Sequence, residues 1–176
     1  MFSDPIENIS HMYVAEGMHV ADFGAGAGFY TLALADKVGP YGKVYAIDVQ
    51  TEHLSRIQHE AERRGLKCVE LVHGDLEASR GSGLTAGSVD RVIITNILFQ
   101  TDHPERIAVE AKRIVKRSGK VGVVEWLESF NMMGPHPDHI ISEGKVTEMF
   151  IAAGLILEEK FDAGTHHYGL LFKSDI

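Results

Sequence analysis

The sequence predicts one α/β domain in which helices cover both faces of a mostly parallel sheet. Three observations predict it: apolar strand-like runs alternate with helical patterns, three alternate glycines join the first strand to a helix, and two β-rich runs end the chain. Strands that alternate with helices favour a parallel sheet, and a closing hairpin adds an antiparallel strand. At 176 residues the chain is long enough for one substantial core, so we expect a single domain over 1–176.

The N-terminal arm, residues 1–17, carries helix-start chemistry. Ser3 and Asp4 offer capping oxygens, Pro5 suits a first helical turn, and Glu7 follows in the position that a helix dipole favours. A short helix is therefore expected before the first strand.

The remaining elements follow from periodicity and from glycine or proline stops. Thr51 is expected to cap the second long helix, and Val115 to belong to the buried side of the helix that ends before Gly119. The expected strands are 18–23, 43–47, 68–73, 91–95, 121–126, 155–162 and 167–173, and the expected helices are 29–38, 51–64, 102–118 and 146–153.

The segment 127–141 has no sustained period and contains Gly134, Pro135 and Pro137. It is expected to be a loop that acts as a lid over a pocket.

Composition narrows the function. Seventeen basic and twenty-five acidic side chains give a net charge of −8, which disfavours nucleic acid as a partner even though Arg63, Arg64 and Lys67 cluster in sequence. The one cysteine, Cys68, falls in an apolar strand pattern and is expected to be buried. No apolar run is long enough to span a bilayer and no leader is evident, so a cytoplasmic location is expected.

The loop at 24–28 has the form of a ligand cradle. Glycines at 24, 26 and 28 allow a sharp turn at the N-terminus of a helix, where N–H groups and the dipole favour a carboxylate or phosphate. A dinucleotide motif counted from Gly24 would need glycine at 29, and that position is Phe29, which weakens a nicotinamide hypothesis.

The pattern Asp22-x-Gly24-x-Gly26-x-Gly28 resembles the first motif of class I S-adenosylmethionine-dependent methyltransferases. The whole chain looks like a small stand-alone member akin to the ubiquinone/menaquinone-type group. The resemblance implies a Rossmann-like sheet of seven strands with an antiparallel strand near the C-terminus. It also implies S-adenosyl-L-methionine as cofactor, S-adenosyl-L-homocysteine as product, and in-line methyl transfer to oxygen or carbon of a small-molecule acceptor.

Acidic residues at matching strand ends extend the resemblance. Asp48 follows the second strand about 20 residues after the loop, where a carboxylate accepts two ribose hydroxyls, although a helix-capping role is the alternative. Asp75 resembles the residue that receives the adenine amino group, and Asp22 the residue that helps hold the methionine amino group. The resemblance assigns the methionine carboxylate to loop amides. The expected cofactor site is Asp22, Gly24, Ala25, Gly26, Gly28, Asp48, Val49, Gly74, Asp75, Leu76 and Asn96.

Methyl transfer by in-line displacement depends mainly on alignment and does not require a particular catalytic residue. Candidates are His103 and His136, in loops expected near the pocket, and Asn96, after the fourth strand. Ile97 and Leu98 follow Asn96, unlike the Asn-Pro-Pro-Tyr of enzymes that methylate amide or adenine nitrogen. The ten histidines show no metal-ligand spacing, so no metal site is expected.

Several alternatives stay open. With only about 17 residues before the first strand, the chain departs from larger family members, whose additional helices close over the acceptor. A non-catalytic protein that binds S-adenosylmethionine, a methyltransferase acting on protein or RNA, and a nicotinamide enzyme remain as alternatives, and so does the choice between a monomer and a homodimer.

Overall fold

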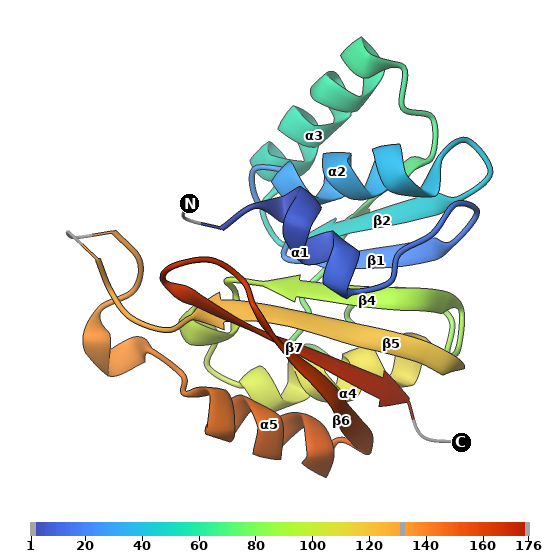
Figure 1. The fold of residues 1–176 in the computed structure, drawn as a ribbon. Helices are drawn as coiled ribbons and strands as arrows, with labels where there is room; N and C mark the ends of the chain where they lie inside the picture. The colour runs from blue at the N-terminus through green and yellow to red at the C-terminus, as the bar shows by residue number, and fades with distance from the viewer. Residues whose placement is uncertain (1–2, 131–132, 175–176) are drawn as a thin grey trace.

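Seven strands form one sheet in the order β3-β2-β1-β4-β5-β7-β6 (Figure 1). The computed structural model describes residues 3–130 and 133–174. Strands β1 to β5 pair in parallel, and β7 is antiparallel to both of its neighbours. The strands are β1 (His19–Phe23), β2 (Lys43–Asp48), β3 (Val69–His73), β4 (Val89–Thr95), β5 (Val115–Trp126), β6 (Leu155–Asp162) and β7 (His167–Ser174).

Helices cover both faces of this sheet, as Figure 1 shows. One face carries α1 (Pro5–His11), α2 (Phe29–Val38) and α3 (Thr51–Arg64); the other carries α4 (Pro104–Ile114) and α5 (Glu143–Ala152). Short 3₁₀ turns, η1 (Leu98–Gln100) and η2 (Pro137–His139), follow β4 and β5. The strand order reverses between β1 and β4, so the chain leaves these two strands in opposite directions and opens a crevice at their carboxyl ends.

The core has two layers, one on each face of the sheet. Ile94, Ile107 and Phe150 belong to the layer under α4 and α5, where Phe150 stacks on Phe172 with ring centroids 5.0 Å apart. Met12 and Leu34 belong to the layer under α1 and α2. Burial on both faces explains why the central strands read as continuous apolar runs rather than as an alternating pattern.

The predicted fold is confirmed, including an antiparallel strand, β7, near the C-terminus of the chain. Two local expectations were wrong. The fourth helix ends at Ile114, because Val115 pairs with Val89 and starts β5. Thr51 does not cap α3: Gln50 is the N-cap residue and has no side-chain capping bond. Instead, the Asp48 carboxylate accepts the Gln50 N–H at 2.8 Å and closes the turn.

Cys68 is buried as expected, with its Sγ directed at the carbonyl of Ala35. In the part of the chain that the structure describes, no helix combines the length and the apolar character that a membrane crossing requires.

Candidate active site

A cavity of about 710 Å³ lies at the carboxyl edge of the sheet, over the point where the strand order reverses. The loops after β1 to β4 contribute to its wall, together with the last residue of β5, the first residue of β7 and the N-terminal arm. Of the residues predicted from sequence, the wall contains Gly24, Ala25, Gly26, Asp48, Val49, Gly74, Asp75, Leu76 and Asn96. It also contains residues that were not predicted as site residues, among them Ser3, Tyr30, His53, Glu77, Thr95, Trp126 and His167.

The glycine loop is tied to β2 by its own amides. The N–H groups of Gly24 and Ala25 donate to the carbonyl of Ile47 at 2.9 and 3.1 Å, and the Gly26 N–H donates to Asp48 Oδ2 at 2.8 Å. Gly24 has a φ of +70°, and a Cβ there would lie 2.3 Å from Cγ2 of Ile97. Only glycine therefore fits at 24, and the amides that the resemblance assigned to a ligand carboxylate already have protein acceptors.

Asp48 ends β2 and joins three neighbours. Oδ2 accepts from Gly26 and lies 3.3 Å from Nδ1 of His53, while Oδ1 accepts the Gln50 N–H. The side chain is buried, at 7% exposure, yet it belongs to the cavity wall. A carboxylate oxygen can accept two hydrogen bonds, so Asp48 keeps capacity for a ligand donor while it holds the loop.

Asp22 lies in β1 and does not belong to the cavity wall. It is fully buried, its Oδ2 accepts the Thr31 hydroxyl at 2.6 Å, and its Oδ1 has no hydrogen-bond partner among the described residues. Burial raises the pKa of Asp22 to about 6, although the bonds from Thr31 lower it. Gly28 is also outside the wall: it is the N-cap residue of α2, with a φ of +85°.

The loop after β3 carries Asp75 and Leu76 into the wall. Asp75 is exposed, and its Oδ1 accepts the Glu77 N–H at 2.9 Å, whereas Leu76 is buried at 7% exposure. Glu77 in turn accepts the backbone N–H of His103 at 2.5 Å. The His103 imidazole itself is exposed, faces Glu105 at 3.4 Å and does not line the cavity.

Asn96 follows β4 in an unusual backbone conformation, with a φ of +54°. Ile97 follows with φ −120° and ψ −26°, and the successive N–H groups of Ile97 and Leu98 point at one anion. The anion is the carboxylate of Glu125, which accepts from Leu98 at 2.7 Å and also from Ile97. Asn96 Oδ1 is buried in this wall with no partner in the part of the chain described.

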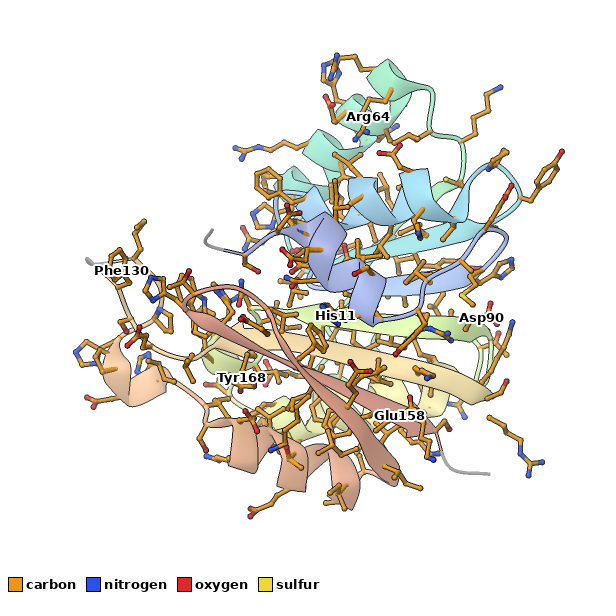
Figure 2. The ribbon with its side chains drawn as sticks, in the orientation of Figure 1. His11, Arg64, Asp90, Phe130, Glu158 and Tyr168 are labelled. Atoms are coloured by element: carbon orange, nitrogen blue, oxygen red, sulfur yellow. The ribbon has the colours of Figure 1, made fainter. Side chains whose placement is uncertain are left out.

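Glu125 is 1% exposed at the carboxyl end of β5, and this burial raises its pKa to about 7 even though the amides of Leu98 and Ile97 lower it. Its cross-strand neighbour is Tyr168, which Figure 2 labels on β7 and whose hydroxyl donates to the carbonyl of Ile141 at 2.7 Å. Burial, with the Glu125 charge nearby, raises the pKa of Tyr168.

The remaining wall is aromatic. Trp126 ends β5 and His167 begins the antiparallel β7, so the two residues pair at the same edge of the sheet with ring centroids 4.2 Å apart. Tyr30 lines the cavity from the first turn of α2. His53 lies in the first turn of α3, five residues after Asp48 in the chain, and the sequence analysis did not identify it. His167 could not be found from sequence, because it depends on the register of the hairpin.

The described residues between β5 and η2, 127–130 and 133–136, form no helix or named strand. Gly134 packs against Trp126: a Cβ there would lie 2.8 Å from Cε3 of the indole. Phe130 lies toward the outer end of this loop (Figure 2). His136 is exposed, sits 3.4 Å from Asp138 and does not line the cavity. The predicted lid residues Asn131 and Met132 lie outside the described residues.

The family model described as "Methyltransferase domain" matches residues 15–154. The chain belongs to this family. The chain is 32% identical over 119 residues to demethylmenaquinone methyltransferase of Bacillus mycoides, and the match covers 68% of this chain and 49% of the relative. It is 29% identical over 110 residues to arsenite methyltransferase of Aquipseudomonas alcaligenes, covering 60% of this chain and 32% of the relative. The chain thus spans a third to a half of the length of these curated relatives.

Among solved structures, the chain resembles an S-adenosylmethionine-dependent methyltransferase from Aquifex aeolicus, with a TM-score of 0.87 and 29% identity over 97% of this chain and 89% of that one. The family and the fold imply S-adenosylmethionine as the cofactor. The wall fits that molecule: Asp48 has spare acceptor capacity toward ribose hydroxyls, and the orphaned Oδ1 of Asn96 offers an acceptor to a ligand donor. Within residues 3–130 and 133–174, no three His, Cys, Asp or Glu side chains gather as metal ligands.

Proposed function

We propose that this methyltransferase moves the methyl group of S-adenosylmethionine to oxygen or carbon of a small-molecule acceptor. The observation that carries the proposal is the cavity itself, in which the predicted cofactor residues other than Asp22 and Gly28 line one space together with Tyr30, Trp126 and His167. Its volume of about 710 Å³ lies in the range of about 300–1,000 Å³ that is usual for small-molecule sites.

The charge of the wall supports a small acceptor over a polynucleotide. Asp48, Asp75 and Glu77 line the cavity, and no lysine or arginine does so among the described residues. Phosphodiesters are bound mainly through basic side chains, so an acidic wall in a chain of net charge −8 disfavours RNA. The same argument favours an acceptor that is neutral or cationic where it enters the cavity.

The relatives point the same way, because demethylmenaquinone and arsenite are both small molecules. For arsenite the chain lacks the thiols that such an acceptor favours: Cys68 is its one cysteine, and it is buried against Ala35 outside the cavity wall.

The residues of the chain supply alignment and exclusion of water. When bound, S-adenosylmethionine supplies an electrophilic methyl group on a sulfonium sulfur. Asp48 and Leu76 would hold the nucleoside end, and Trp126 and His167 would exclude water from the part of the cavity that they line. Asn96, whose Oδ1 has no partner among the described residues, would offer this oxygen to orient a donor group of a ligand.

A labelled-methyl screen tests the proposal. The protein is incubated with S-adenosylmethionine labelled in the methyl group and with cell extract separated by size and by charge. Label is expected in a molecule below about 1 kDa that does not bind an anion exchanger. The Asp48→Ala variant is the matched control and should transfer far less label.

Two results would contradict the proposal. Label in protein or RNA would assign a macromolecular substrate. Binding of S-adenosylhomocysteine without transfer to any fraction would support the non-catalytic alternative, a protein that keeps the cofactor site only.

A further inference from the structure

Three polar side chains meet at the edge of the cavity, two of them in its wall and the third, Asn8, behind them. Asn8 of α1 is 1% exposed, and its Nδ2 donates to the Ser3 hydroxyl at 2.8 Å and to the Tyr30 hydroxyl at 2.7 Å. Ser3 and Tyr30 both line the cavity. A polar cluster is thus presented to a ligand at the first turn of α2.

Helix α1 holds this cluster in place. The Asp4 carboxylate caps its first turn by accepting the Ile6 N–H at 2.8 Å. At the other end, the buried guanidinium of Arg91 donates to the carbonyls of Met12 and Tyr13 at 2.8 and 3.0 Å. Asn8 therefore reaches Tyr30 from a helix that is fixed at both ends.

The protons of the cluster can be counted. Asn8 Oδ1 has no partner among the described residues, but the opposite amide orientation would bury two N–H donors without acceptors, which costs more. The Tyr30 oxygen therefore accepts from Asn8, and it also lies within hydrogen-bond reach of the Ser3 hydroxyl. The bond with Ser3 lowers the pKa of Tyr30, as a bond donated by the Ser3 hydroxyl to the Tyr30 oxygen does. The Tyr30 proton then stays available to a ligand acceptor.

Tyr30 keeps its proton at neutral pH. Burial raises its pKa, and the charge of Asp22 acts in the same direction, although the bonds with Asn8 and Ser3 lower it. The hydroxyl is accordingly a donor to the cavity and not a phenolate.

A ligand carboxylate at this place has few other partners. The amides of Gly24 and Ala25 are bonded to Ile47, that of Gly26 to Asp48, and that of Gly28 to the carbonyl of Ala25 at 2.9 Å. The described wall also has no lysine or arginine. What remains beside the loop is the N-terminal end of α2, whose dipole favours a carboxylate, and the Tyr30 hydroxyl.

We propose that the Tyr30 hydroxyl donates a hydrogen bond to the carboxylate of the cofactor's methionine and that Asn8 positions this hydroxyl. The proposal rests on S-adenosylmethionine as cofactor and is independent of the acceptor. It replaces the loop amides of Gly24 and Gly26, which the resemblance assigned to this carboxylate, by a side-chain contact.

Calorimetry with two ligands tests it. S-adenosylhomocysteine carries the methionine-derived carboxylate, and 5′-methylthioadenosine lacks the amino-acid end. Tyr30→Phe should weaken the binding of S-adenosylhomocysteine about tenfold, which is the lower end of the effect of losing a hydrogen bond to a charged group. The affinity for 5′-methylthioadenosine should stay unchanged. S-adenosylmethionine and its decarboxylated analogue form a second pair, of which only the first should lose affinity. Tyr41→Phe, a change at an 83% exposed tyrosine, is the matched control and should alter neither.

Asn8→Ala separates positioning from contact. It should weaken S-adenosylhomocysteine less than Tyr30→Phe does, and it should add nothing in the Tyr30→Phe background. Thermal unfolding confirms that each variant is folded. The proposal is overturned if Tyr30→Phe binds S-adenosylhomocysteine with wild-type affinity. It is also overturned if the variant loses the same affinity for both ligands of a pair, since Tyr30 would then only shape the cavity wall. Neither result would bear on the acceptor, because no acceptor is present.

Discussion

Replacing Asp48 by alanine is the most direct perturbation of the predicted nucleoside site. The side chain bridges the glycine loop and the start of α3, because its oxygens accept the amides of Gly26 and Gln50, each at 2.8 Å. The same oxygens are expected to accept the two ribose hydroxyls of the cofactor. Asp48→Ala therefore removes a ligand contact and loosens the loop that frames it.

The magnitude follows from hydrogen bonds to a charged group, which contribute about 1.5–3 kcal/mol. Loss of the ribose contact alone should weaken S-adenosylhomocysteine about 10- to 150-fold. The amides of Gly26 and Gln50 lose their acceptor at the edge of solvent, so the free energy of unfolding should fall by about 1–2 kcal/mol. Affinity should thus suffer more than stability.

Isothermal calorimetry with S-adenosylhomocysteine measures the affinity, and urea unfolding measures the stability. Asp36→Ala is the matched control, because Asp36 is an exposed aspartate paired with Arg64 away from the cavity, and it should leave affinity unchanged. A folded Asp48→Ala protein with wild-type affinity would remove Asp48 from the cofactor site and refute the reasoning.

Three further predictions follow from the described contacts. Gly26→Val should abolish S-adenosylhomocysteine binding, since the φ of +50° strains a β-branched residue and the space its side chain would enter is the cavity; retained binding in a titration would contradict this. Glu125→Gln should remove a pH dependence of stability. The folded pKa of about 7 exceeds the ordinary 4.5, so the wild type is stabilised by the protonated form below pH 4.5 and loses roughly 3 kcal/mol as pH rises through 7. Thermal melts of both proteins between pH 5 and 8 measure this effect. The stability of the wild type relative to Glu125→Gln should rise as the pH falls, and parallel curves would argue against the prediction. Gly134→Ala should shift the indole of Trp126, since a Cβ would meet it at 2.8 Å with φ at +84°. Affinity for S-adenosylhomocysteine should stay near wild type while methyl transfer falls; an equal loss of both would place Gly134 at the nucleoside site.

The order of the elements and the position of the ligand edge could be predicted from sequence. Helical and strand periods are local properties, and the glycine loop fixes where a strand turns into a helix. Since the carboxyl ends of parallel strands share one edge, Asp48, Asp75 and Asn96 could be assigned to one cavity without coordinates, and all three do line it.

Only the tertiary structure decided which side chains complete that cavity. Tyr30, Trp126 and His167 come from a first helical turn, a strand end and an antiparallel strand start, and their meeting depends on register and on how α1 packs. The same packing removed His103 and His136 from the wall. A one-residue change of register moves a side chain to the other face of a sheet, so no local pattern could have fixed these contacts.

For the acidic residues too, the sequence indicated positions and the tertiary structure decided their contacts. The sequence placed Asp22 at the end of β1 but could not show that Thr31 would take up one of its oxygens and that the loop would cover it. Nothing in the sequence indicated that Glu125 would be buried and hydrogen-bonded, because its partner amide at Leu98 belongs to a turn 27 residues away in the chain. Sequence determines which groups stand at the edge of this sheet, and packing decides which of them face the ligand, since burial and hydrogen bonding depend on neighbours that are distant in the chain.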